Sequence, residues 1–117
     1  MKYALLIYSN EAREAFDQMS EDEQRSIMGE YEAIAESPGV VGGAQLEPIE
    51  AATTVRVEDG QALTTDGPFA ETKEQLGGYY LVDCKDLDEA IEVAARIPGA
   101  STGSIEVRPI MEFPARD

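Results

Sequence analysis

The sequence predicts an α+β fold built from two β-α-β halves with a β-hairpin inserted between them. Three observations lead to this prediction. Continuous apolar runs at residues 2–8 and 78–84 are typical of strands buried on both faces. Each run is followed by a segment in which hydrophobic residues recur at helical spacing after a capping residue. The dipeptide Asp59-Gly60 lies between two strand-like runs and is typical of a tight hairpin turn.

The first half of the chain is expected to run from a strand into a helix. A short helical turn is predicted within residues 11–19. Ser20, with Glu23 three residues later, predicts a capping box in which each side chain satisfies an unpaired backbone amide. The helix should end at Ser37, because Pro38 disfavours helical backbone in the residue before it.

The second half of the chain contains the hairpin, a helix and a final strand. Residues 40–49 read as an irregular strand weakened by glycines, and residues 53–57 and 62–65 flank the Asp-Gly turn. Asp86 should cap the next helix, and residues 104–110 should form the last strand. The expected buried stripe of that helix comprises Leu87, Ala90, Ile91, Ala94 and Ile97.

Two β-α-β halves of this length match the ferredoxin-like arrangement, a split β-α-β fold with an antiparallel sheet and both helices on one side. A doubly wound sheet is the alternative, but it needs more consecutive β-α units than this chain has. We find no linker, repeat or low-complexity tract, so residues 1–117 are predicted to form a single domain.

The first strand is apolar on both of its faces. Alternation places Ala4, Leu6 and Tyr8 on one face, and Tyr3, Leu5 and Ile7 on the other. Because helices cover only one face of such a sheet, the second face needs another cover. We expect a homodimer in which two sheets stack into a dimeric α+β barrel. The alternative is that the first helical segment or the hairpin folds over the second face of its own chain.

Charge and residue usage exclude several function classes. The chain has 9 basic and 24 acidic residues, a formal net charge of −15, so it cannot present the basic surface that nucleic acids or anionic membranes require. It contains no histidine, which excludes Ser-His-Asp catalysis and histidine-ligated zinc. We therefore expect neither a metal nor a cofactor, and no nucleic-acid or membrane partner.

Cys84 is the single cysteine, which precludes a disulfide within one chain and favours a reducing compartment. The apolar run at residues 2–8 is too short for a signal peptide or a membrane span. We expect a cytoplasmic protein. Cys84 should be a small buried hydrophobe, since Asp83 and Asp86 raise the pKa of a nearby thiol.

Residues 65–83, with the sequence TDGPFAETKEQLGGYYLVD, stand apart from generic α+β sequence. This segment resembles the signature of the DGPF-domain family, a branch of the YCII-related proteins. Residues 1–8, 52–57 and 104–109 also resemble strands of that family, so the resemblance covers essentially the whole chain. It implies a dimeric, ferredoxin-like α+β barrel.

The resemblance also bears on activity. Members of the family are often encoded beside extracytoplasmic-function sigma factors and mostly have no assigned activity. A few YCII-related proteins resemble muconolactone isomerases and are linked to dehalogenation of chlorinated lactones through a proposed His-Asp pair. This sequence departs from that subgroup because it has no histidine. Proton transfer near pH 7 would need a carboxylate of raised pKa or Lys73 with a lowered pKa.

The candidate site residues gather around the DGPF segment. Asp66 and Glu71 offer carboxylates that accept hydrogen bonds, and Lys73 offers an ammonium that donates to an anionic or carbonyl ligand. Arg56 and Tyr8 complete the predicted ligand-binding set. The alternative is structural: Asp66 caps a turn and Lys73 pairs with a carboxylate.

Aromatic residues beside this segment carry further expectations. Phe69 is expected to bury its ring beneath the loop. Tyr8, Tyr79 and Tyr80 could line a cavity between two sheets and offer hydroxyls to a ligand, but aromatic residues on strands more often serve in packing. Arg56 and Arg108, on predicted strands, could each hold an anionic ligand group, but with so many carboxylates in the chain ordinary salt bridges are favoured for both.

Three functions are compatible with these residues. In the first, the chain binds a small molecule in a barrel cleft or acts as an accessory or regulatory protein. Alternatively, it is a cofactor-free isomerase or lyase acting on a small carbonyl or lactone, with Asp66 or Glu71 as base and Lys73 or Arg56 stabilising charge. The third alternative is a protein-interaction module linked to sigma-factor regulation.

Overall fold

A computed structural model of the chain describes residues 1–9, 12–69 and 74–113. Its main sheet has four antiparallel strands in the order β2-β5-β1-β6. Their bounds are β1 (Lys2–Ser9), β2 (Val40–Gln45), β5 (Gln75–Asp83) and β6 (Ser104–Pro109). Each β-α-β unit therefore spans one intervening strand: β5 lies between β1 and β2, and β1 lies between β5 and β6. This order confirms the predicted α+β class and the split β-α-β arrangement, and within the described residues the sheet is open.

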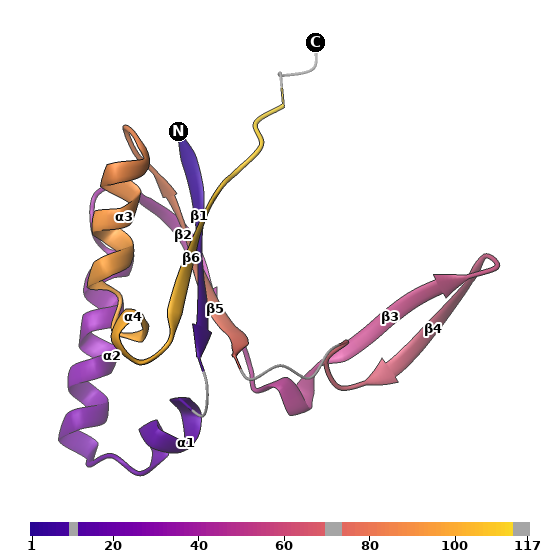
Figure 1. Ribbon diagram of the computed structural model, residues 1–117. Helices are drawn as coiled ribbons and strands as arrows, with labels where there is room; N and C mark the ends of the chain where they lie inside the picture. Colours follow the sequence, from indigo (N-terminus) through magenta and orange to yellow (C-terminus); the bar gives the residue numbers. More distant parts are fainter. Residues whose placement is uncertain (10–11, 70–73, 114–117) are drawn as a thin grey trace.

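Four α-helices are found in the described residues: α1 (Ala12–Asp17), α2 (Glu21–Ala35), α3 (Leu87–Arg96) and α4 (Gly99–Thr102). Both predicted caps are confirmed. The Glu23 amide donates to Ser20 Oγ over 3.1 Å, and the Glu89 amide donates to Asp86 Oδ1 over 3.0 Å. The two long helices, α2 and α3, lie on the same side of the sheet (Figure 1).

The hydrophobic core lies between this sheet face and the helices. Tyr3, Leu5 and Val82 point from the sheet into it and are 2%, 0% and 1% exposed. From the helical side the core receives Ile34, Ala90, Val93, Ala94 and Ile97. Tyr3 and Leu5 thus lie together on the face that the helices cover, in agreement with the predicted alternation.

The predicted stripe of α3 is wrong at two positions. Leu87 is 47% and Ile91 48% exposed. The other three predicted residues, Ala90, Ala94 and Ile97, are buried, and Val93, which was not predicted, is buried with them. A stripe this narrow, with alanine at its centre, lets α3 lie close to the sheet.

Tyr80 also faces the helices, so for this residue the packing role favoured from the sequence is confirmed and the cavity between two sheets is not. It is 9% exposed, and its hydroxyl donates to the Tyr31 carbonyl over 3.0 Å. This hydrogen bond ties β5 to α2. Burial raises the pKa of both tyrosine hydroxyls above the ordinary value, and at Tyr31 a backbone hydrogen bond from Gly99 partly opposes that rise.

We expect Tyr80→Phe to lower the free energy of unfolding near pH 7 by about 1 kcal/mol, because the hydrogen bond to Tyr31 is lost. Above pH ~10 the difference should narrow. Tyrosines of the unfolded chain ionise at a lower pH than Tyr80 in the folded chain. Above pH ~10 the wild type therefore loses the stabilisation that the raised pKa of Tyr80 provides at lower pH.

Urea unfolding of both proteins at neutral and alkaline pH measures this effect. Tyr79→Phe is the matched control, since Tyr79 precedes Tyr80 on the strand and points to the opposite face. A difference between wild type and Tyr80→Phe that stays constant up to high pH would contradict the assignment.

A second, two-stranded sheet is formed by β3 (Thr53–Glu58) and β4 (Gln61–Asp66). Asp59 and Gly60 adopt φ of 51° and 77°, which confirms the predicted tight turn. We call residues 46–69 the hairpin arm; it includes the short 3₁₀ helix η1 (Ile49–Ala51).

The hairpin arm projects from the main sheet on the side opposite α2 and α3 (Figure 1). The radius of gyration, 16.6 Å, reflects this projection. A compact domain of this length would have about 13 Å. The arm extends away from the sheet, so the alternative in which the hairpin covers the second face of its own chain is wrong.

Candidate functional site

The second face of the main sheet is apolar at its centre. It carries the side chains of Ala4, Leu6, Tyr8, Tyr79 and Leu81, which we call the open face. Leu6 pairs with Tyr79 on one side and with Glu106 on the other, and Ala4 pairs with Leu81. All five residues are partly exposed, whereas Tyr3, Leu5, Tyr80 and Val82 on the helical face are buried. The predicted two-sided apolar sheet is therefore confirmed, and α2 and α3 leave this side uncovered (Figure 1).

One edge of the open face is charged. Arg108 Nη2 and Glu106 Oε1 on β6 form an ion pair at 2.7 Å, as expected for Arg108. Both side chains are well exposed, so the pair contributes little to stability. On the edge strand β6, Glu106 pairs with Leu6 and Arg108 pairs with Ala4. A polar border therefore lies beside the apolar centre of the open face.

Tyr8 lies at the end of the open face from which the hairpin arm departs. It pairs with Leu76 at the beginning of β5, just after a shift in register between Ile7 and Tyr8. Gly103 passes so close to the Tyr8 carbonyl that a Cβ atom there would collide with it. This close approach fixes the backbone of Tyr8 and hence the position from which its phenol extends.

The Asp-Gly-Pro segment closes the base of the hairpin arm. The Gly67 amide donates to the Ala52 carbonyl over 2.6 Å, and Thr54 Oγ1 donates to the Gly67 carbonyl over 2.7 Å. Gly67 has a φ of 95°, a conformation that favours glycine. Within this segment the glycine has the structural role that sequence reasoning assigned to it.

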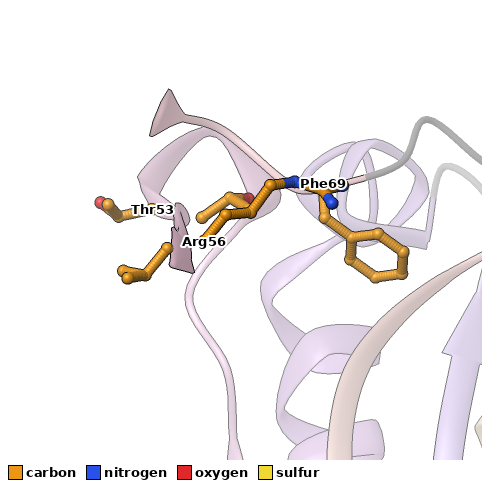
Figure 2. A pocket seen from close by; sticks show the side chains of 5 residues that line it. Thr53, Arg56 and Phe69 are labelled. Atoms are coloured by element: carbon orange, nitrogen blue, oxygen red, sulfur yellow. The ribbon is translucent and has the colours of Figure 1, made fainter. Parts of the chain in front are cut away.

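A hollow of about 420 Å³ opens on the arm, lined by Thr53, Thr54, Val55, Arg56 and Phe69 (Figure 2). Phe69 is 80% exposed, so the prediction of a buried ring is wrong. The segment before it is hydrogen-bonded to the hairpin through Gly67. A second hollow of about 300 Å³, between the end of α2 and β2, contains none of the predicted site residues.

The structure separates the predicted site residues. Asp66 pairs with Thr53, whereas Arg56 pairs with Leu63, so alternation directs Asp66 and Arg56 to opposite faces of the hairpin. Tyr8 belongs to the open face of the main sheet. Glu71 and Lys73 lie outside the described residues. Sequence reasoning did not group Arg56 with Phe69 and Thr53, which line the same hollow.

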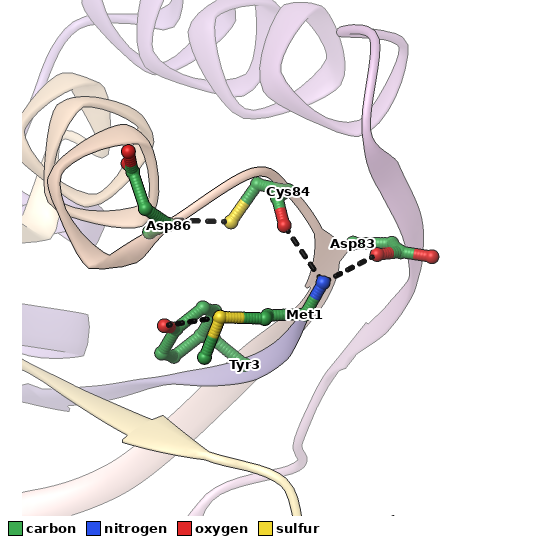
Figure 3. Close-up of polar contacts among 5 residues, drawn as sticks. All are labelled: Met1, Tyr3, Asp83, Cys84 and Asp86. Carbon is green, nitrogen blue, oxygen red and sulfur yellow. Dashed lines mark hydrogen bonds and ion pairs between the residues drawn. The ribbon is translucent and has the colours of Figure 1, made fainter.

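Cys84 has the structural role predicted for it. It is 8% exposed, and its thiol donates to the Asp86 carbonyl over 3.4 Å (Figure 3). The ammonium of Met1 donates to the Cys84 carbonyl over 2.8 Å and to Asp83 Oδ1 over 3.3 Å. Burial, followed by the charge of Glu89, raises the pKa of the thiol. The thiol therefore stays protonated near pH 7 and is a weak nucleophile.

No group of three or more potential metal-ligating side chains is found within residues 1–9, 12–69 and 74–113. In the same part of the chain, none of the helices has the length and apolar character needed to cross a bilayer. The candidate site residues described above lie on two separate surfaces, the open face and the hairpin arm.

Comparison with known proteins places this arrangement in a family. A family model of the YCII-related domain matches residues 1–114. The chain belongs to the YCII-related family. An uncharacterised protein of Rhizobium meliloti (strain 1021) is similar to it, with 43% identity over 116 residues, covering 94% of this chain and 92% of the relative. The YCII-related part of the predicted resemblance is confirmed, and membership of the DGPF branch stays a prediction.

Proposed function

We propose that this YCII-related domain functions as a homodimer whose two open faces stack and enclose a cleft that binds a small molecule. The observation that carries the proposal is the apolar centre of the open face, around Leu6, Tyr79 and Leu81, which no helix covers. Apolar patches of this kind on a single chain mark interaction surfaces. A second copy supplies an identical face at the spacing of about 10 Å that stacked sheets adopt.

The lining of such a cleft favours a small, mainly apolar molecule with one hydrogen-bonding group. Leu6 and Leu81 supply aliphatic surface, and Tyr8 and Tyr79 supply rings that end in hydroxyls. Small-molecule sites commonly combine apolar walls with a few polar groups that orient the ligand. The net charge of −15 disfavours a strongly anionic ligand.

We propose binding rather than catalysis as the primary activity. A general base works best when its pKa lies near the working pH. Burial shifts the pKa values of Tyr31, Tyr80 and Cys84 upward, further from neutrality, and these three residues are not part of the open face. The isomerase or lyase function and the sigma-factor link stay predictions from the sequence, as does a cytoplasmic location.

Sedimentation equilibrium and methyl NMR test this proposal together. We expect a dimer at micromolar concentration, and titration with phenol or cyclohexanone as probes should move the methyl resonances of Leu6 and Leu81. The methyl groups of Leu5 are the internal control, because Leu5 is fully buried on the helical face. A monomer at these concentrations would overturn the stacked dimer, and unmoved Leu6 and Leu81 resonances at millimolar probe would overturn the ligand site.

A further inference from the structure

The hairpin arm exposes a row of apolar side chains. Residues that pair directly across two antiparallel strands lie on the same face, so Val55, Val57 and Ala62 share one face of the hairpin with Thr64. We call these four residues the valine face. Val55 is 59% and Val57 69% exposed. Valine is a strand-forming residue that contributes most where a neighbouring surface covers it.

The arm has little to stabilise it within its own chain. A two-stranded ribbon alone is marginally stable in water, and a third strand or a packed layer is normally needed. Every residue of β4, Gln61–Asp66, is exposed. The tight turn and the hydrogen bonds at Gly67 define the hairpin, yet no described part of the chain packs on the valine face.

The direction of the arm indicates what covers it. The arm leaves the sheet near the beginning of β5 and projects on the side of the open face (Figure 1). A second copy stacked on that face would occupy the adjacent space. Strands of six residues are about 20 Å long, which exceeds the spacing of about 10 Å between stacked sheets. The arm is therefore long enough to reach past the interface onto the second copy.

The area of the open face also bears on the second copy as the partner of the arm. Strands are spaced about 4.8 Å apart and rise about 3.3 Å per residue, so a four-stranded sheet with a central strand of eight residues presents about 500 Å². Stable protein interfaces bury about 800 Å² on each partner. The arm adds the exposed side chains of Val55 and Val57 to the flat area of the sheet.

We infer that the hairpin arm of each chain docks through its valine face on the second copy and completes the homodimer. This inference rests on the stacked dimer proposed above. It makes the interface reciprocal, since each copy gives one arm and receives one. Phe69 and the hollow beside Arg56 lie at the base of the same arm, so the second copy approaches this candidate site as well.

The double substitution Val55→Thr with Val57→Thr tests the inference. Threonine keeps the β-branched shape and the hairpin but replaces a methyl group with a hydroxyl at each position. We expect the dissociation constant of the dimer to rise at least about tenfold in sedimentation equilibrium. Ile91→Thr is the matched control: Ile91 is 48% exposed on α3, on the helical side, and its replacement should leave the dissociation constant unchanged.

Hydrogen exchange provides a second readout. The amides of β3 and β4 should exchange more slowly as wild-type protein concentration rises through the dissociation constant, and this dependence should weaken in the double variant. A dimer whose dissociation constant and arm exchange are the same in wild type and double variant would overturn the arm inference and leave the stacked dimer intact. A wild type that is monomeric throughout would overturn both, and an arm protected only on addition of another protein would assign the valine face to that partner instead.

Discussion

Leu5→Ala should lower the free energy of unfolding of the single chain by about 2–5 kcal/mol. Leu6→Ala should instead mainly weaken the association of two chains into a dimer. Leu5 is 0% exposed between the sheet and the helices, so its truncation leaves a cavity in the core. Leu6 points to the open face and is partly exposed in the single chain. The two leucines thus form a matched pair on opposite faces of one strand.

Denaturant unfolding at two protein concentrations separates the two effects. The loss of stability in Leu5→Ala should be the same at both concentrations, because it arises within one chain. The loss in Leu6→Ala should grow at concentrations where the wild type is dimeric, since association adds to apparent stability. Equal, concentration-independent losses at both positions would show that the open face is covered within a single chain.

Local signals in the sequence predicted most of the fold. Ser20 and Asp86 cap their helices through side-chain oxygens, and Asp59-Gly60 makes the turn; each depends on residues at most a few positions apart. Alternation correctly assigned Leu5 and Leu6 to opposite faces because a strand reverses side-chain direction at every residue. These features are set by backbone geometry that neighbouring residues determine.

The errors in the predicted fold arise where packing between elements distant in sequence decides which side chains are buried. Leu87 and Ile91 fit a helical apolar pattern, but the contact of α3 with the sheet is narrow enough for alanines to fill it. Phe69 was predicted to bury its ring beneath the loop, whereas it is 80% exposed. Neither outcome is encoded in the spacing of nearby residues.

The candidate site was predicted less well than the fold. Tyr8 is correctly placed on the face that the helices leave bare. Arg56 and Asp66 were grouped with it because they are close to the DGPF segment in sequence, yet both lie on an arm that projects from the sheet (Figure 1). The direction of that arm depends on the connections around η1 and Gly67, which carry no periodic pattern. A composite site could therefore be expected from the sequence, but its geometry could not.

Leu6→Glu should raise the dissociation constant of the dimer by at least about a thousandfold and leave the single chain folded. Leu6 pairs with Tyr79 and with Glu106, so the new carboxylate enters an apolar centre beside an existing negative charge. The neighbouring guanidinium of Arg108 is already paired with Glu106. Stacking of two copies would therefore bury one added charge from each chain without a partner of its own, which is strongly destabilising. In the single chain the carboxylate stays hydrated, because Leu6 is partly exposed there.

Light scattering with circular dichroism measures both parts of this expectation. Ile91→Glu is the matched control: it adds the same charge at a side chain that is 48% exposed on the helical side, and it should remain dimeric. Leu6→Met should also remain dimeric, because methionine keeps the apolar volume. If Leu6→Glu stays a dimer, the open face is not the interface and the cleft between the two sheets does not exist. If only Leu6→Glu dissociates while its circular dichroism is that of the folded wild type, then the apolar open face is part of the interface that holds the two copies together.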